Sequence, residues 1–226
     1  MGIGGAIGKR VGSNVHKLAP DLTSHFVHEA LARAINGVGR FPGAAAAADS
    51  QLKEQGGDVD AAIHEVIENH VRYAGAGGFV TNLGGVVTAA VTIPANITGL
   101  ALLQCRMVAG IAHLRGYELA DPRVHNAILA CMLGEDSVKS LIKKQKLPAP
   151  PMAIATAPTY DPHLDKVMAA EVTSELLTQV AGKRVATTVG RRIPVVGGVV
   201  GAGVDGFATW RIGRYADSEL RPRTLR

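Results

Sequence analysis

The chain has no acidic, basic or histidine side chain between Tyr73 and Cys105, a run of 33 residues, although charged residues make up 19% of its 226 residues. Aromatic residues are scarce throughout, at 4%. A run without charge must be hidden from water, either in a protein core or in a lipid bilayer. A core with few aromatics depends on close backbone approach through Gly and Ala. These shortages favour tightly packed helices.

Cysteine is also nearly absent. Cys105 and Cys131 are the only two, and both lie in apolar segments. This count excludes a disulfide framework and a Cys-rich zinc site, so a cytoplasmic location is expected. The N-terminal residues lack a long apolar stretch, and Ala6 stands where a myristoylation motif needs Ser or Thr. We therefore expect neither a secretory signal nor lipidation.

No segment alternates apolar and polar residues in the manner of a half-buried strand. Asp, Ser, Pro and Gly instead mark helix ends. The predicted helices cover residues 24–35, 44–54, 58–74, 94–115, 122–134, 136–144, 161–190 and 194 onward. The sequence predicts an all-α fold, a compact multi-helix bundle with a central glycine-rich apolar helical hairpin at 79–105.

One domain accounts for the length. We expect a flexible glycine-rich N-terminus over residues 1–23 and a single helical domain over 24–216. A proline-rich linker, 146–162, lies inside that domain, and a basic tail follows at 217–226.

Gly84, Gly85 and Pro94 divide the uncharged run into two segments. The first is too short to span a bilayer, and the second carries Arg106 near its middle, where a charge in lipid is costly. A simple transmembrane span is therefore disfavoured. Two alternatives remain: a core hairpin wrapped by the other helices, and a hairpin that dips into one leaflet.

Arg106 lies among apolar residues, so its guanidinium needs a partner or a polar channel. Asp205, isolated in a glycine-rich helix, is the predicted partner, with Glu65 and Glu68 as alternatives. A buried ion pair that fixes helix docking is favoured. An anion or headgroup site and simple exposure stay open.

Small residues form a stripe on the last predicted helix. Gly198, Ala202 and Gly206 are spaced by four, and Gly197 and Gly201 add a second pair. This spacing predicts close helix packing. Gly84 and Gly85 are assigned the same role.

No motif predicts a catalytic residue, a metal site or a cofactor. His64 and His70 are six apart and cannot share a zinc ion as two histidines four apart on a helix do. The glycine-rich segments lack the Gly-Lys-Ser/Thr of a phosphate loop, and no GxSxG nucleophile motif is present.

Basic residues give a formal charge of +5 and a pI near 9.4. Few aromatics accompany the cations, so anionic lipid is favoured over nucleic acid as the partner. Trp210, Arg211 and Arg214 suit an interface anchor. The basic tail adds Arg221, Arg223 and Arg226.

Several blocks resemble one known family. They include INGVGRF (35–41), HVRYAGAGGFVTNLGG (70–85), IPAN (93–96), LQCRMVAGIAHLRGYEL with DPRV (103–124), LLTQVAGK (176–183) and IPVVGGVVGAGVDGFATWRIGRYA (193–216). With these blocks in order, the chain resembles the bacterial EcsC family from about residue 35 to residue 216. The resemblance implies a helical protein without an established catalytic activity, in a family named after a protein encoded beside an ABC transporter.

The predicted function is therefore non-catalytic. We expect a cytoplasmic helical protein that associates peripherally with the inner face of the membrane and binds anionic lipid or a membrane protein such as a transporter. Two alternatives remain. One is an enzyme acting on a lipid or other apolar substrate, and the other is a protein that self-assembles through its small-residue stripes.

Overall fold

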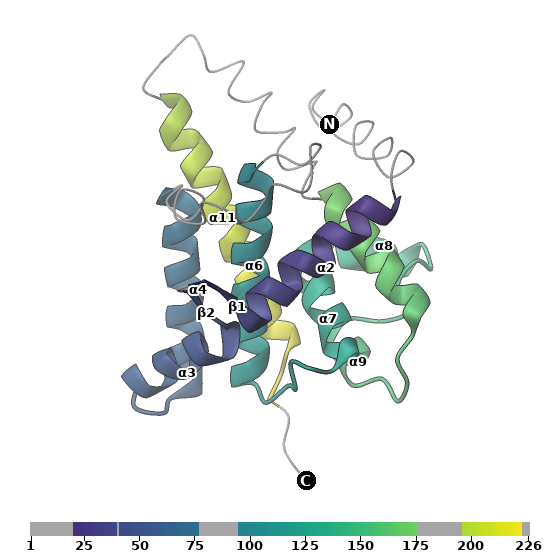
Figure 1. The fold of residues 1–226 in the computed structure, drawn as a ribbon, viewed down its shortest axis with the longest axis horizontal. Coiled ribbons are helices and arrows are strands. Elements are labelled where there is room, and N and C mark those ends of the chain that lie inside the picture. The colour runs from purple at the N-terminus through teal and green to yellow at the C-terminus, as the bar shows by residue number, and fades with distance from the viewer. Residues whose placement is uncertain (1–19, 40, 77–94, 176–195, 223–226) are drawn as a thin grey trace.

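The structure, a computed structural model, describes residues 20–39, 41–76, 95–175 and 196–222. Its elements, in chain order, are α2 (Pro20–Asn36), β1 (Gly37–Val38), β2 (Phe41–Pro42), α3 (Ala44–Glu54), α4 (Val59–Ala76), α6 (Ala95–Leu114), α7 (Pro122–Leu133), α8 (Glu135–Lys143), α9 (Pro151–Ala155) and α11 (Val196–Glu219). Residues 162–175 form a further helix. The prediction of an all-α multi-helix bundle is confirmed (Figure 1).

Helix α6 lies in the middle of the bundle, where it packs against α2, α3, α4, α7 and α11 (Figure 1). Its large apolar side chains are fully enclosed, among them Leu103, Met107, Val108 and Ile111. The end of the uncharged run that the structure describes, residues 99–105, is therefore buried in protein. The first half of the predicted hairpin, 79–93, and the pair Gly84 and Gly85 lie outside the described residues.

Helix ends fall at the predicted punctuation. The Asp121 carboxylate accepts a hydrogen bond from the Arg123 backbone N–H at 2.8 Å, and Pro122 opens α7. Gly134 closes that helix with φ at +77°. Local capping chemistry thus sets this boundary.

A small antiparallel hairpin, β1 paired with β2, was not predicted. Apart from Pro42, its strand residues belong to the INGVGRF block. Gly37 has φ at +89°, and a Cβ there would sit 2.6 Å from the Phe41 carbonyl oxygen. Only glycine allows this turn. Pairs of two residues are too short to show a strand pattern in the sequence.

Some helix bounds differ from the prediction. Helix α2 begins at Pro20, since proline is favoured in the first turn. Helix α4 runs through Gly75 to Ala76, although glycines predicted its end there. Gly75 approaches Gly206 of α11 closely, because a Cβ on Gly206 would lie 3.9 Å from the Gly75 Cα. Gly75 thus lies at the contact between α4 and α11.

The segment predicted as a proline-rich linker is partly folded onto the bundle. It contains α9, which packs against α7. Leu147, Pro151 and Ile154 are buried there. Pro151 opens the short helix, so proline acts here as a helix start rather than as a spacer.

Candidate functional site

Helix α11 has one face packed against α4 and α6. A Cβ on Gly213 would lie 2.9 Å from Ile67 Cγ1 and 3.1 Å from the Met107 sulfur. A Cβ on Gly206 would lie 3.6 Å from the Val71 carbonyl oxygen. The missing side chain at Gly213 lets α11 lie directly on its neighbours, whereas a Cβ at Gly206 would make only ordinary contacts.

The remaining members of the predicted small-residue stripe are not placed in this detail. Gly197, Gly198, Gly201 and Ala202 belong to α11, but their surroundings lie outside the described residues. Gly213, which the prediction did not include, has the tightest surroundings of the α11 glycines that are described. Its position one residue before Arg214 in a basic stretch gave no signal of burial.

The opposite face of α11 is apolar and open to solvent. Val204, Phe207 and Trp210 are 45%, 61% and 47% exposed. Their spacing of three places them along one side of the helix. We call these three residues the aromatic face. Apolar side chains gathered on one exposed surface are typical of a site that another surface covers.

Phe207 and Trp210 contact each other within this face. Their ring centroids are 6.0 Å apart and their planes differ by 19°, which is a stacked arrangement. Trp210 is the single tryptophan of the chain. Both stacked rings are exposed at the surface rather than buried in the core. Trp210 is followed directly by the basic residue Arg211.

Two of those basic residues have carboxylate partners. Arg211 lies 2.8 Å from the Asp136 carboxylate at the start of α8. Arg214 lies 3.5 Å from Asp217. Both arginine side chains are more than half exposed, so these pairs are weak and exchangeable. Arg221 is exposed in the tail, while Arg223 and Arg226 lie outside the described residues.

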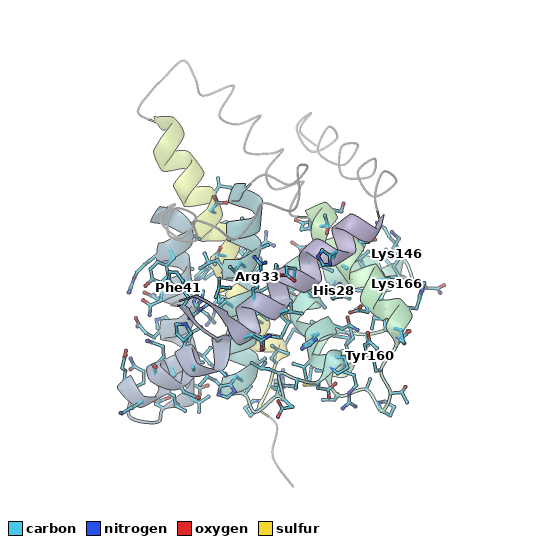
Figure 2. All side chains as sticks on the ribbon, viewed as in Figure 1. His28, Arg33, Phe41, Lys146, Tyr160 and Lys166 are labelled. Carbon is cyan, nitrogen blue, oxygen red and sulfur yellow. The ribbon has the colours of Figure 1, made fainter. Side chains whose placement is uncertain are left out.

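Two other basic residues of the described segments belong to a different part of the fold. Figure 2 shows Lys146 and Lys166 on the side of the molecule formed by residues 162–175, away from α4. Lys146 pairs with Glu171 at 2.8 Å.

A cavity of about 530 Å³ opens beside these α11 residues. It lies between α11, residue 175 and the junction of α7 with α8. Trp210, Arg211 and Arg214 line one part of it, and the carboxylates of Glu135 and Asp136 line another. No sequence pattern indicates this cavity, because its walls come from segments far apart in the chain.

Arg106 lies on α6 and is half-buried. Among the ion pairs between described residues, none joins Arg106 to Asp205 of α11. Glu65 and Glu68, the other predicted partners, contact Arg72 at 3.6 and 2.9 Å. The predicted docking pair therefore has no support in this part of the chain, and an anion site at Arg106 stays a prediction.

The surroundings of Arg106 affect two titrating groups. Burial lowers the pKa of its own guanidinium, and Tyr73 partly offsets this effect. The pKa of His70 is lowered to about 4, mainly because burial disfavours the charged ring. The hydrogen bond with the Val66 carbonyl raises this pKa, and the Arg106 charge lowers it further. The neutral His70 ring donates from Nδ1 to the Val66 carbonyl oxygen at 2.7 Å. His70 is thus a neutral packing residue at ordinary pH.

A charge cluster that the sequence did not predict joins three helices. The Arg115 side chain, only 12% exposed, lies 2.8 Å from Asp60 of α4 and 2.7 Å from Asp217 of α11. Burial lowers the pKa of Arg115, but the two carboxylates outweigh it and the net pKa is raised. A single arginine at a predicted helix end does not identify such distant partners.

Helices α6 and α11 also share a buried polar contact. The Gln104 amide donates to the Thr209 hydroxyl at 3.3 Å, and both residues are fully buried. A buried pair of this kind favours one alignment of the two helices, because any shift leaves polar groups unpaired.

The histidines of the described segments do not converge on a metal site. His64 lies 3.5 Å from Glu68 within α4, and His113 lies 2.7 Å from Asp49. Across the described parts of the chain, no group of three or more His, Cys, Asp or Glu side chains is placed to hold a metal ion.

Four serine and threonine hydroxyl groups donate hydrogen bonds to nearby backbone. Ser50, Thr156 and Thr173 each donate to the carbonyl one helical turn earlier, and Ser218 donates to the Tyr215 carbonyl. Burial raises the pKa of the Cys105 thiol to about 12, so it carries little thiolate. These arrangements stabilise helices rather than activate a nucleophile.

The fold and this surface define a class: an all-α bundle with a tightly packed glycine face and an exposed aromatic face on one helix. The chain belongs to the EcsC protein family, whose model matches residues 5–225. No curated protein and no solved structure matches the chain. Among the helices described, none has both the length and the apolar character that crossing a membrane requires.

Proposed function

We propose that the protein is a non-catalytic helical protein that binds peripherally to the anionic inner face of the cell membrane through the aromatic face of α11. The observation that carries this proposal is the exposed Phe207–Trp210 stack beside Arg211 and Arg214. Tryptophan prefers the membrane interface, where the ring lies among lipid headgroups. Arginine beside it contacts lipid phosphates.

Charge supports the same surface as the attachment site. The chain carries a formal charge of +5, and Arg221 extends the basic residues beyond the end of α11. A cation near an anionic leaflet contributes about 1 kcal/mol at physiological salt. Such contributions add to the burial of the two rings and produce reversible, salt-sensitive binding.

A lipid surface fits the aromatic face better than a second copy of the chain does. Where the structure describes the side chains of α11, the exposed apolar part consists of three residues and is bordered by arginines, whereas stable protein interfaces bury a larger apolar centre. If lipid vesicles do not bind the protein, attachment to a membrane protein, such as a transporter, is the alternative.

Flotation of the full chain with vesicles tests the proposal. We expect the protein to float with phosphatidylglycerol vesicles at low salt, and to float less at high salt and with neutral phosphatidylcholine vesicles. Absence of flotation with both vesicle types at both salt concentrations would reject lipid binding.

Trp210 gives a direct readout because it is the single tryptophan. Its fluorescence should shift to the blue when phosphatidylglycerol vesicles are added, and brominated lipid should quench it. Binding without quenching would show that another surface attaches to the vesicle.

A matched pair of variants locates the attachment. Phe207→Ser should weaken vesicle binding about tenfold, since removing one partly inserted ring costs about 1.4 kcal/mol. Met152→Ser removes an exposed apolar side chain on α9, away from α11, and should leave binding unchanged. Equal loss in both variants would contradict the assignment to α11.

A further inference from the structure

We infer that the cavity beside α11 binds the headgroup of a phospholipid that carries both a phosphate and a primary amine. This inference rests on the proposed membrane attachment and specifies the lipid. It draws on the cavity's two kinds of charge, its position and its size.

The cavity presents opposite charges on different elements. Arg211 and Arg214 come from α11, Glu135 and Asp136 come from the first turn of α8, and Glu175 comes from the helix of residues 162–175. Glu135 is paired with Lys139, and Asp136 with Arg211. A guanidinium fork matches a phosphate group, and a carboxylate accepts hydrogen bonds from a primary ammonium. A purely anionic headgroup would lie close to three acidic residues, so a headgroup with both charges fits this lining better.

Both groups of the existing ion pair can exchange their partner for a charged group of a ligand. Arg211 and Asp136 are 2.8 Å apart, with side chains 53% and 83% exposed. Such an exposed pair contributes about 0–1 kcal/mol. A ligand phosphate on Arg211 and an ammonium on Asp136 therefore replace the pair at little cost.

Position connects the cavity to the bilayer. Trp210 lines the cavity and also belongs to the aromatic face. When the aromatic face enters the interface, lipid headgroups lie at the level of Trp210. The cavity then opens beside them, so a lipid can place its headgroup inside while its acyl chains stay in the leaflet.

Size agrees with this ligand. The cavity measures about 530 Å³, and sites for small molecules span roughly 300–1,000 Å³. A headgroup with its glycerol backbone fills such a space only in part, which leaves room for water around the charged groups.

The test compares vesicles with the same phosphatidylglycerol fraction and either phosphatidylethanolamine or phosphatidylcholine as the remainder. We expect the full chain to bind the ethanolamine vesicles about three- to fivefold more tightly, because the choline ammonium has no N–H to donate to the carboxylates. Equal binding to the two mixtures would overturn the inference while leaving the membrane attachment intact.

Variants separate the cavity from general effects of lipid packing. Asp136→Asn should remove the ethanolamine preference and retain binding to phosphatidylglycerol, whereas Arg214→Gln should remove the preference and also weaken binding to phosphatidylglycerol. Glu54→Gln on α3 and Arg72→Gln on α4, both exposed and outside the cavity lining, should keep the preference. Urea unfolding of each variant checks that the fold is unchanged. A preference that survives in Asp136→Asn would reject the cavity as its source.

Soluble phosphoethanolamine distinguishes a lipid ligand from a free one. Calorimetry with this compound should show binding much weaker than to vesicles. If the chain floats with no vesicle but binds phosphoethanolamine, the proposed membrane function fails and the lipid form of the inference fails with it. If it binds neither, both are rejected.

Discussion

The two faces of α11 differ although one sequence segment builds both. One face has glycines where α4 and α6 approach, and a Cβ on Gly213 would lie 2.9 Å from Ile67. The other face carries Val204, Phe207 and Trp210 in solvent. The comparison teaches that the packed face of this helix combines glycine with buried side chains such as Ile212, while Phe207 and Trp210 add little to the core and are available for binding.

The largest effect is expected when the packed face receives a side chain. Gly213→Leu should lower the free energy of unfolding by about 3 kcal/mol or more, because the new atoms overlap Ile67 and Met107. Urea denaturation measures the change. Gly203→Leu is the matched control, since no atom lies within 4 Å of a Cβ there, and it should be neutral or slightly stabilising. Similar costs at the two positions would contradict the distinction between the faces.

The next effect concerns the charge cluster that joins the packed helices. Arg115→Met should cost about 2 kcal/mol, because it removes the closer and more buried of the two guanidinium partners of Asp217. Arg72→Met removes an exposed arginine with two carboxylate neighbours and should cost less than about 0.5 kcal/mol. The measurement is thermal unfolding of both variants at the same pH, where Arg115→Met should have the lower midpoint. Equal midpoints would show that Arg115 contributes no more than a surface pair.

A pH effect of intermediate size should come from His70. Its pKa is about 4 in the folded protein and 6.5 in the reference state. Because the folded value is lower, the unfolded chain binds the proton first. The free energy of unfolding is therefore highest above about pH 6.5 and falls by about 2 kcal/mol as the pH drops toward 4.

Urea unfolding measured across this pH range tests the sign and the source. His70→Gln should flatten the dependence between pH 6.5 and 4. His64→Gln alters an exposed histidine on the same helix and should keep it. A dependence that survives in His70→Gln would assign it to other groups.

The smallest effect on stability is expected on the aromatic face. Phe207→Ala should change the free energy of unfolding by no more than about 0.5 kcal/mol, since the ring is mostly exposed. Ile212→Ala on the same helix removes a buried side chain and should cost about 2–4 kcal/mol. If Phe207→Ala proved as costly as Ile212→Ala, the aromatic face would belong to the core.

Much of the fold was predictable because its signals are local. Asp121 with Pro122 placed the start of α7, and Gly134 placed its end. The absence of charge predicted that residues at the start of α6 are hidden, and residues 99–105 are buried. Trp210, Arg211 and Arg214 were predicted as an interface anchor, and all three side chains are exposed.

The misses share a different cause. Both Val204 and Ile212 are apolar residues of α11, yet one is exposed and the other buried. Hydropathy along this helix shows no preferred face, so the sequence does not say which side packs. Arg115 illustrates the same limit, because its partner Asp217 is 102 residues away.

The sequence by itself determined where most helices begin and end and that the bundle is helical, since caps, prolines and glycines act on the backbone within one turn. The tertiary structure decided which face of α11 lies on α4 and α6, which carboxylates meet Arg115, and that a cavity opens beside Trp210. These features depend on surfaces that meet only after the chain has packed, and no local pattern encodes their distances.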